Sequence, residues 1–262
     1  MSDFINKQLL QFLSFLKNPT DETPLPITFA SKFKIVLSFF LLEIPVMLVL
    51  ILIISGLENA KLINTDNHSI EALLKTVPTT ALFFLVVIIA PLFEELIFRL
   101  YLRYETNLLI GTSIRFSYLF FDREKAAQFD LALNSKWSRF YPKIFYFSAL
   151  LFGLVHLVNF EITPAILLLS PIIVAPQIVL GLVIGYLRVR HGFWTGFLMH
   201  SFHNFVFMGI SVIALKTNPD LDKKKISQQR IIEWNSSHAC IVYNMCKHEK
   251  VLQLKEGCIE QL

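Results

Sequence analysis

Charged side chains are scarce in this sequence: Asp, Glu, Lys and Arg make up 17% of the residues, whereas 54% are hydrophobic. The mean hydropathy is +0.56. A soluble domain normally carries about 25% charged residues, so this composition predicts a chain that crosses a membrane several times. The net charge of only +4 comes from basic residues between apolar runs. It indicates cytoplasmic loops rather than a surface that binds nucleic acid.

Cysteine is also nearly absent. The three cysteines, Cys240, Cys246 and Cys258, all lie close to the end of the sequence and are too few and too irregularly spaced for a disulfide framework. With His238 and His248 they fit no structural zinc spacing, so we expect no metal site in the tail. We expect no cleavable signal peptide either, because the first apolar run is long and begins far into the chain.

The apolar runs predict an all-α fold, a polytopic bundle of transmembrane helices. Five runs are long enough to cross about 30 Å of hydrocarbon, at residues 35–55, 77–100, 144–162, 166–187 and 192–215. The count rises to six to eight if re-entrant or interfacial helices are included, for example within 101–121. No internal repeat is visible, which argues against a carrier built from inverted repeats.

Three regions are expected along the chain. Residues 1–32 hold an N-terminal helix and a linker, 33–215 the membrane domain, and 216–262 a polar tail. The helical stripe at 3–17 predicts a helix that either lies on the membrane or packs against the bundle. Residues 101–143 are rich in Lys and Arg and predict a long basic loop. Its charge places the N-terminus on the cytoplasmic side.

Two adjacent glutamates and an arginine stand at the end of the second apolar run: Glu94, Glu95 and Arg99. A charge near the middle of a membrane costs roughly 2.5–3.5 kcal/mol on insertion scales, so these groups need partners or a task. On a helix, Glu95 and Arg99 share a face and can pair. Glu94 points about 100° away and is left as a free acid or base. The alternative is an ion pair with a structural role alone.

Further polar groups occur in the third and fifth runs, namely His156, His200 and Asn204. At about 1.5 Å per residue, Glu94, His156 and His200 lie at similar depths from one side of the membrane if the spans alternate. This agreement predicts one shared cavity. The alternative for each histidine is an interior polar group with satisfied hydrogen bonds and no chemical role.

These side chains suit the hydrolysis of an amide bond. A carboxylate can take a proton from water and pass it to a leaving amine, while a neutral imidazole orients that water. His200 and Asn204, four residues apart on one helix face, can donate to a developing oxyanion. Phe152, one turn before His156, is expected to pack over the site.

The fourth run carries two signals for helix packing. Gly181 and Gly185 form a G-x-x-x-G face that predicts the close approach of another helix. Pro171 and Pro176 in the same run predict a kink.

Taken in order, three short motifs resemble the pattern of the CPBP intramembrane proteases: Glu94-Glu95-x-x-x-Arg99, Phe152-x-x-x-His156 and His200-x-x-x-Asn204. That family includes the CAAX prenyl endopeptidases and bacteriocin-processing or self-immunity proteins. The resemblance covers about residues 77–210. It implies that Glu94 acts with His156 to activate water and that His200 and Asn204 form the oxyanion site. Glu95, Arg99 and Phe152 would then support this geometry.

The resemblance implies an intramembrane endopeptidase that cleaves a membrane-associated or prenylated, CAAX-type substrate. It would reside in a bacterial inner membrane with its site open to the cytoplasm. The expected partners are membrane lipid and a membrane-associated peptide or protein, without nucleic acid; the oligomeric state is open. The alternatives are a non-catalytic immunity or binding scaffold and a proton-coupled carrier.

A metal-dependent mechanism is the competing interpretation of the same residues. Glu94, His156 and His200 would then form a His₂Glu zinc site. The sequence has no H-E-x-x-H motif, and Asn204 is a poor zinc ligand but a good oxyanion donor. We therefore favour a glutamate-dependent hydrolase with no cofactor and keep zinc as the alternative.

Overall fold

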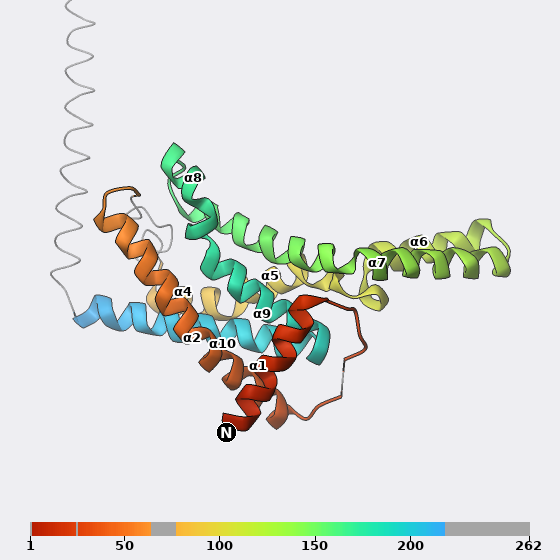
Figure 1. Ribbon diagram of the computed structural model, residues 1–262, viewed down its shortest axis with the longest axis horizontal. Helices are drawn as coiled ribbons and strands as arrows, with labels where there is room; N and C mark the ends of the chain where they lie inside the picture. Colours follow the sequence, from red (N-terminus) through yellow and green to blue (C-terminus); the bar gives the residue numbers. More distant parts are fainter. Residues whose placement is uncertain (1, 25, 64–76, 218–262) are drawn as a thin grey trace, which may run out of the picture. The chain divides into compact units, whose positions relative to one another are not determined.

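The structure is a computed structural model that describes residues 2–24, 26–63 and 77–217 (Figure 1). Its elements, in chain order, are α1 (Ser2–Lys17), α2 (Phe29–Asn59), α4 (Thr79–Phe84), the π-helix η1 (Leu85–Ile89), α5 (Ala90–Phe98), the 3₁₀ turns η2 (Leu100–Leu102) and η3 (Tyr104–Thr106), α6 (Leu108–Phe120), α7 (Arg123–Val155), the 3₁₀ turn η4 (His156–Asn159), α8 (Pro164–Ile173), α9 (Ala175–His191) and α10 (Phe193–Thr217). The described residues contain no β-strand. One compact unit ends at Met208, and every contact described below lies within it.

Five helical segments are long and apolar enough to cross a membrane, so the predicted all-α bundle with five spans is confirmed. They cover Phe29–Asn59, Thr79–Leu102, Arg123–Asn159, Pro164–His191 and Phe193–Ile213. The fourth segment is broken at Val174, between α8 and α9. The break falls between Pro171 and Pro176, whose rings remove two main-chain donors, as the kink prediction requires. The division into regions at residues 32 and 215 stays a prediction.

Most of the basic stretch 101–143 is helical: α6 lies where the sequence allows a helix within 101–121, whereas the start of α7 differs from the predicted loop. Helix α7 begins at Arg123, where Asp122 caps it by accepting a hydrogen bond from the Lys125 amide at 2.8 Å. That bond stabilises the carboxylate and lowers the pKa of Asp122. Helix α7 has 33 residues and is about 50 Å long, well beyond the roughly 30 Å of the hydrocarbon core.

Helices α7 and α9 form the most extensive contact of the bundle, and small residues make it possible. A Cβ atom added at Gly181 would lie 3.3 Å from the Ala149 backbone, and one at Gly185 would lie 3.0 Å from the Phe145 ring. The predicted G-x-x-x-G face therefore does bring a second helix close. Helix α7 contributes a small residue as well, since Gly153 leaves room for Ile178 of α9.

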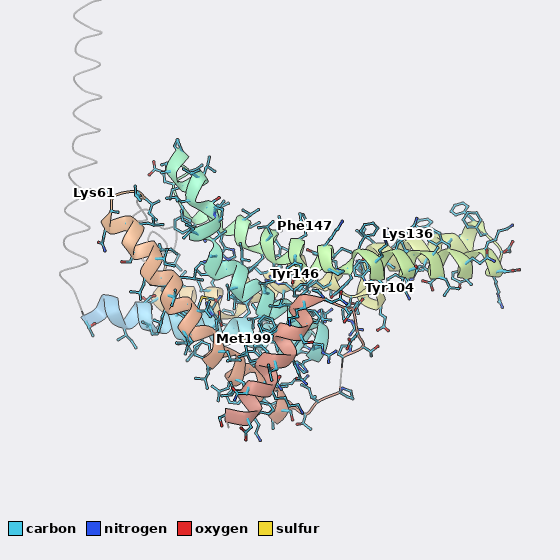
Figure 2. All side chains as sticks on the ribbon, in the orientation of Figure 1. Lys61, Tyr104, Lys136, Tyr146, Phe147 and Met199 are labelled. Carbon is cyan, nitrogen blue, oxygen red and sulfur yellow. The ribbon has the colours of Figure 1, made fainter. Side chains whose placement is uncertain are left out.

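Helix α1 packs against the bundle, as one of the two interpretations of its apolar stripe predicts. The ring of Phe12 meets Phe39 of α2 at a centroid distance of 5.6 Å, and Phe15 meets Tyr186 of α9 at 5.1 Å. Tyr146 of α7, labelled in Figure 2, donates a hydrogen bond to the carbonyl of Leu16 at the end of α1.

The segment between α1 and α2 is held to the bundle by Asp21. Its Oδ2 accepts hydrogen bonds from the main-chain N–H of Tyr104 at 2.6 Å and from the indole N–H of Trp137 at 2.9 Å. Its Oδ1 lies 3.6 Å from Nε of the buried Arg103. Asp21 thus ties the N-terminal segment to the turns that follow α5 and to α7 (Figure 2 labels Tyr104).

We expect Asp21→Ala to lower the free energy of unfolding by about 3 kcal/mol, because it removes two hydrogen bonds to a charged acceptor and leaves Arg103 without this counter-ion. The matched control is Glu105→Ala. Glu105 also pairs with Arg103, but its side chain is 67% exposed, so its loss should cost less than about 1 kcal/mol. Thermal unfolding of the detergent-solubilised protein measures both variants, and equal effects would contradict this account of Asp21.

Candidate active site

The second span brings two carboxylates into the bundle on a single helix, α5. Glu95 is fully buried and lies 3.6 Å from Nη1 of Arg99, which is itself fully buried. Their pairing across one helical turn is as predicted from the sequence. Glu94 points elsewhere, and its side chain keeps 28% exposure. One of the two acids is therefore enclosed with a counter-charge, while the other remains reachable.

His200 of α10 lies between these two acids. Its Nδ1 is 3.2 Å from Oε1 of Glu95, and its Nε2 is 3.4 Å from Oε2 of Glu94. An ionised carboxylate can only accept a hydrogen bond, so Nδ1 carries a proton when Glu95 is ionised. Glu95 therefore holds the imidazole ring and directs Nε2 towards Glu94.

Phe152 of α7 contacts Arg99 of the charged pair and both histidines. Its ring lies 3.8 Å from the guanidinium carbon of Arg99, in a cation–π contact. The same ring packs edge-on against His156 at 4.7 Å and against His200 at 5.6 Å between centroids. Phe152 is fully buried, so it separates the two imidazoles by a fixed apolar spacer.

His156 lies where α7 gives way to a 3₁₀ turn. Its Nδ1 is 2.7 Å from the carbonyl of Phe152, and a carbonyl oxygen only accepts. Nδ1 therefore carries the proton, and in the neutral ring Nε2 is an acceptor. This is the tautomer that can orient a water molecule by accepting its hydrogen.

Asn204, one turn after His200 on α10, makes a contact that its sequence position did not suggest. Its Nδ2 donates a hydrogen bond to the carbonyl of Val86 in the π-helix η1, at 2.9 Å. The amide nitrogen carries two hydrogens, so one remains for another acceptor.

All of these residues fall inside a single family match. Residues 76–206 match the family model described as type II CAAX prenyl endopeptidase Rce1-like. The chain belongs to this family. The match confirms the resemblance to the CPBP intramembrane proteases, and with the five apolar spans it makes the chain an integral membrane protein of a protease family. No curated protein and no solved structure gives a match.

A second acid–histidine pair of this CAAX-type protease family member, with a buried acid and a largely enclosed histidine, was missed in the sequence. Nδ1 of His203, three residues after His200, lies 3.0 Å from Oε1 of Glu43 on α2. Glu43 is an isolated acid in the first apolar run, and no spacing links it to a residue 160 positions later. The only signal was that a lone acid and a spare histidine both stood at membrane depth.

Within the described ranges, no group of three or more His, Cys, Asp or Glu side chains is placed to hold a metal ion. The proposed His₂Glu set does not converge. Both nitrogens of His200 face carboxylates, and Nδ1 of His156 is taken by the Phe152 carbonyl. We derive no step through zinc, and the metal-free mechanism stays a prediction. The cysteines and histidines of the tail lie outside the described residues.

Glycines let the neighbouring helices close over the buried pair. A Cβ at Gly181 would lie 3.1 Å from the Phe152 ring and 3.3 Å from Nη2 of Arg99, and one at Gly196 would lie 3.4 Å from Oε2 of Glu95. The approaches at Gly181 leave no room for a side chain larger than hydrogen without local movement.

We expect Gly181→Ala to lower the free energy of unfolding by about 1–3 kcal/mol, because the added methyl group must displace Phe152 and Arg99. Gly111→Ala in α6 is the control, since a Cβ there meets nothing within 4 Å. It should stabilise slightly, by up to about 1 kcal/mol, through helix propensity. Thermal unfolding in detergent compares the two, and a Gly181→Ala protein as stable as the wild type would refute the close packing.

Proposed function

We propose that this protein is an intramembrane endopeptidase in which Glu94 activates a water molecule to hydrolyse a peptide bond. The observation that carries the proposal is the placement of His200, whose Nε2 lies 3.4 Å from Glu94 while its Nδ1 is held by the buried Glu95. A partly exposed acid beside an oriented imidazole is the arrangement that acid–base hydrolysis requires.

The proposed reaction begins with a water molecule near Glu94 and His156. The water oxygen attacks the carbonyl carbon of the substrate, and its proton passes to the Glu94 carboxylate. Nε2 of His156 accepts the water's other hydrogen bond and so fixes its direction. The resulting tetrahedral intermediate collapses when the C–N bond breaks, and Glu94 returns the proton to the leaving amine.

Two side chains of α10 would stabilise the oxyanion of that intermediate. The free N–H of the Asn204 amide donates directly. His200 donates through Nε2 when its ring carries a second proton. Removing one donor of this kind typically costs 10²–10³-fold in rate.

The substrate we propose is a membrane-associated protein carrying a prenylated, CAAX-type C-terminus, since family membership supports that class. The site would open to the cytoplasmic side, and for a bacterial chain the membrane would be the inner one. The positive charge of 101–143 supports this orientation, because four of its basic residues lie on the first half of α7, outside the apolar part of the span.

The test is cleavage of farnesylated CAAX peptides and membrane-anchored peptides by the purified, reconstituted protein. Glu94→Gln keeps the shape of the side chain and removes the base, so we expect the rate to fall by at least about 10²-fold. Glu105→Gln, an exposed acid outside the site, is the control and should cleave as the wild type does.

The same assay is repeated with a strong chelator. Undiminished cleavage is the outcome expected for the metal-free mechanism, whereas loss with chelator and recovery with zinc would favour a metalloenzyme. Wild-type rates in Glu94→Gln would reject Glu94 as the base. A folded wild type that binds the peptides but cleaves none would favour the non-catalytic scaffold.

A further inference from the structure

The carbonyl of Val86 has no hydrogen-bond donor at the α-helical or π-helical spacing of its own helix. In an α-helix its donor would be the N–H of Ala90, but Ala90 donates to Leu85, five residues back. At the π-helical spacing the donor would be residue 91, which is a proline and has no N–H. From another helix, Nδ2 of Asn204 donates a hydrogen bond to this carbonyl at 2.9 Å.

We propose that Pro91 is a positioning residue for Asn204, because the carbonyl it leaves without a partner fixes the orientation of the Asn204 amide. The oxygen and nitrogen of an asparagine side chain are nearly equal in size, so packing alone does not decide which one faces a neighbour. An acceptor on one side does decide it. With Nδ2 bound to Val86, the second N–H of the same nitrogen stays free, directed about 120° from the first.

The orientation matters because of where Asn204 lies. It stands one turn after His200 and shares its helix face, and Val86 lies two turns before Glu94 in the same span. The contact therefore connects the helix of the base to the helix of the oxyanion donors. A reversed amide would present its oxygen, an acceptor, to the oxyanion and would repel it. This inference rests on the proposed function, in which Asn204 donates to that oxygen.

A purely structural role for Pro91 makes a different prediction. Pro91 is buried, and if it served only to shape the span, its replacement would change stability and substrate binding without depending on Asn204. If Pro91 acts by positioning Asn204, replacing Pro91 has no further kinetic effect once Asn204 has been removed. A double-mutant cycle in the full-length, reconstituted protein separates the two roles.

In Pro91→Ala the new N–H continues the π-helical register in which Ala90 bonds to Leu85, so it competes for the Val86 carbonyl and releases the Asn204 amide. We expect kcat for a farnesylated CAAX peptide to fall by about 10–100-fold, with KM within about twofold of the wild type. The control is Pro171→Ala, an exposed proline within α8, which should keep wild-type kcat. Thermal unfolding of each variant shows that the loss is not one of folding.

The second arm adds Asn204→Ala. This change alone should lower kcat, and the double variant Pro91→Ala/Asn204→Ala should be no slower than Asn204→Ala. If the two falls in kcat multiply in the double variant, Pro91 acts by another route, for example by turning Glu94. That result would overturn the inference. So would wild-type kcat in Pro91→Ala.

A third arm does not depend on activity. In protein labelled with ¹⁵N-asparagine, the Asn204 side-chain signals are identified by their loss in Asn204→Ala. They should shift in Pro91→Ala and stay unchanged in Pro171→Ala. A shift without any cleavage by the wild type would reject the proposed function but keep the Pro91–Asn204 contact. An unchanged signal in Pro91→Ala would reject the contact itself.

Discussion

The enclosed charge of Arg99 is the constraint on which the rest of the site depends. A guanidinium with no exposed surface is tolerable only if its charge is stabilised nearby. Two groups stabilise it here: the carboxylate of Glu95 at 3.6 Å, as counter-charge, and the ring of Phe152 at 3.8 Å, in a cation–π contact. Phe152 cannot move without exposing Arg99, and Glu95 cannot turn away without leaving it unpaired. Both partners also contact His200. The histidine is therefore held by groups whose positions are already set by the arginine.

The two histidines of the site have different hydrogen-bond partners, which give their rings different chemical properties. His200 has a carboxylate at each nitrogen, so that Nδ1 faces the buried Glu95 and Nε2 faces Glu94. His156 has a neutral carbonyl at Nδ1, which fixes one tautomer without adding charge and suits an acceptor. The division of roles proposed for them, with one stabilising an anion and the other orienting water, follows from these partners.

Much of the architecture could be predicted from the sequence because membrane burial leaves long, unambiguous apolar runs. The five spans, the pairing of Glu95 with Arg99 and the close approach at Gly181 depend on local spacing, and the structure bears them out. The start of α7 was missed because its first half is polar and basic. Nothing in hydropathy separates a solvated helix of that kind from a loop; the cap at Asp122 was the available signal.

Contacts between distant spans could not be predicted in the same way. The pair Glu43–His203 and the bond from Asn204 to Val86 join helices whose relative rotation is not encoded in any short spacing. The π-helix could not be predicted from the sequence for a related reason. Its five residues are Leu, Val and Ile, which are equally compatible with an ordinary α-helix, and only the position of Pro91 hinted at an irregular turn.

The π-helix sets the angular register of everything that follows it in the second span. A single π turn accommodates one residue more than an α-helical turn does. If the same residues formed a regular α-helix with none removed, everything after them would rotate by about 100° relative to α4. Glu94 would then turn away from His200, and Glu95 from the centre of the bundle. Loss of one residue between Leu85 and Ile89 has no such effect, because an α-helical turn with one residue fewer returns to nearly the same angle. Over evolutionary time this segment should therefore lose its π turn only together with one residue.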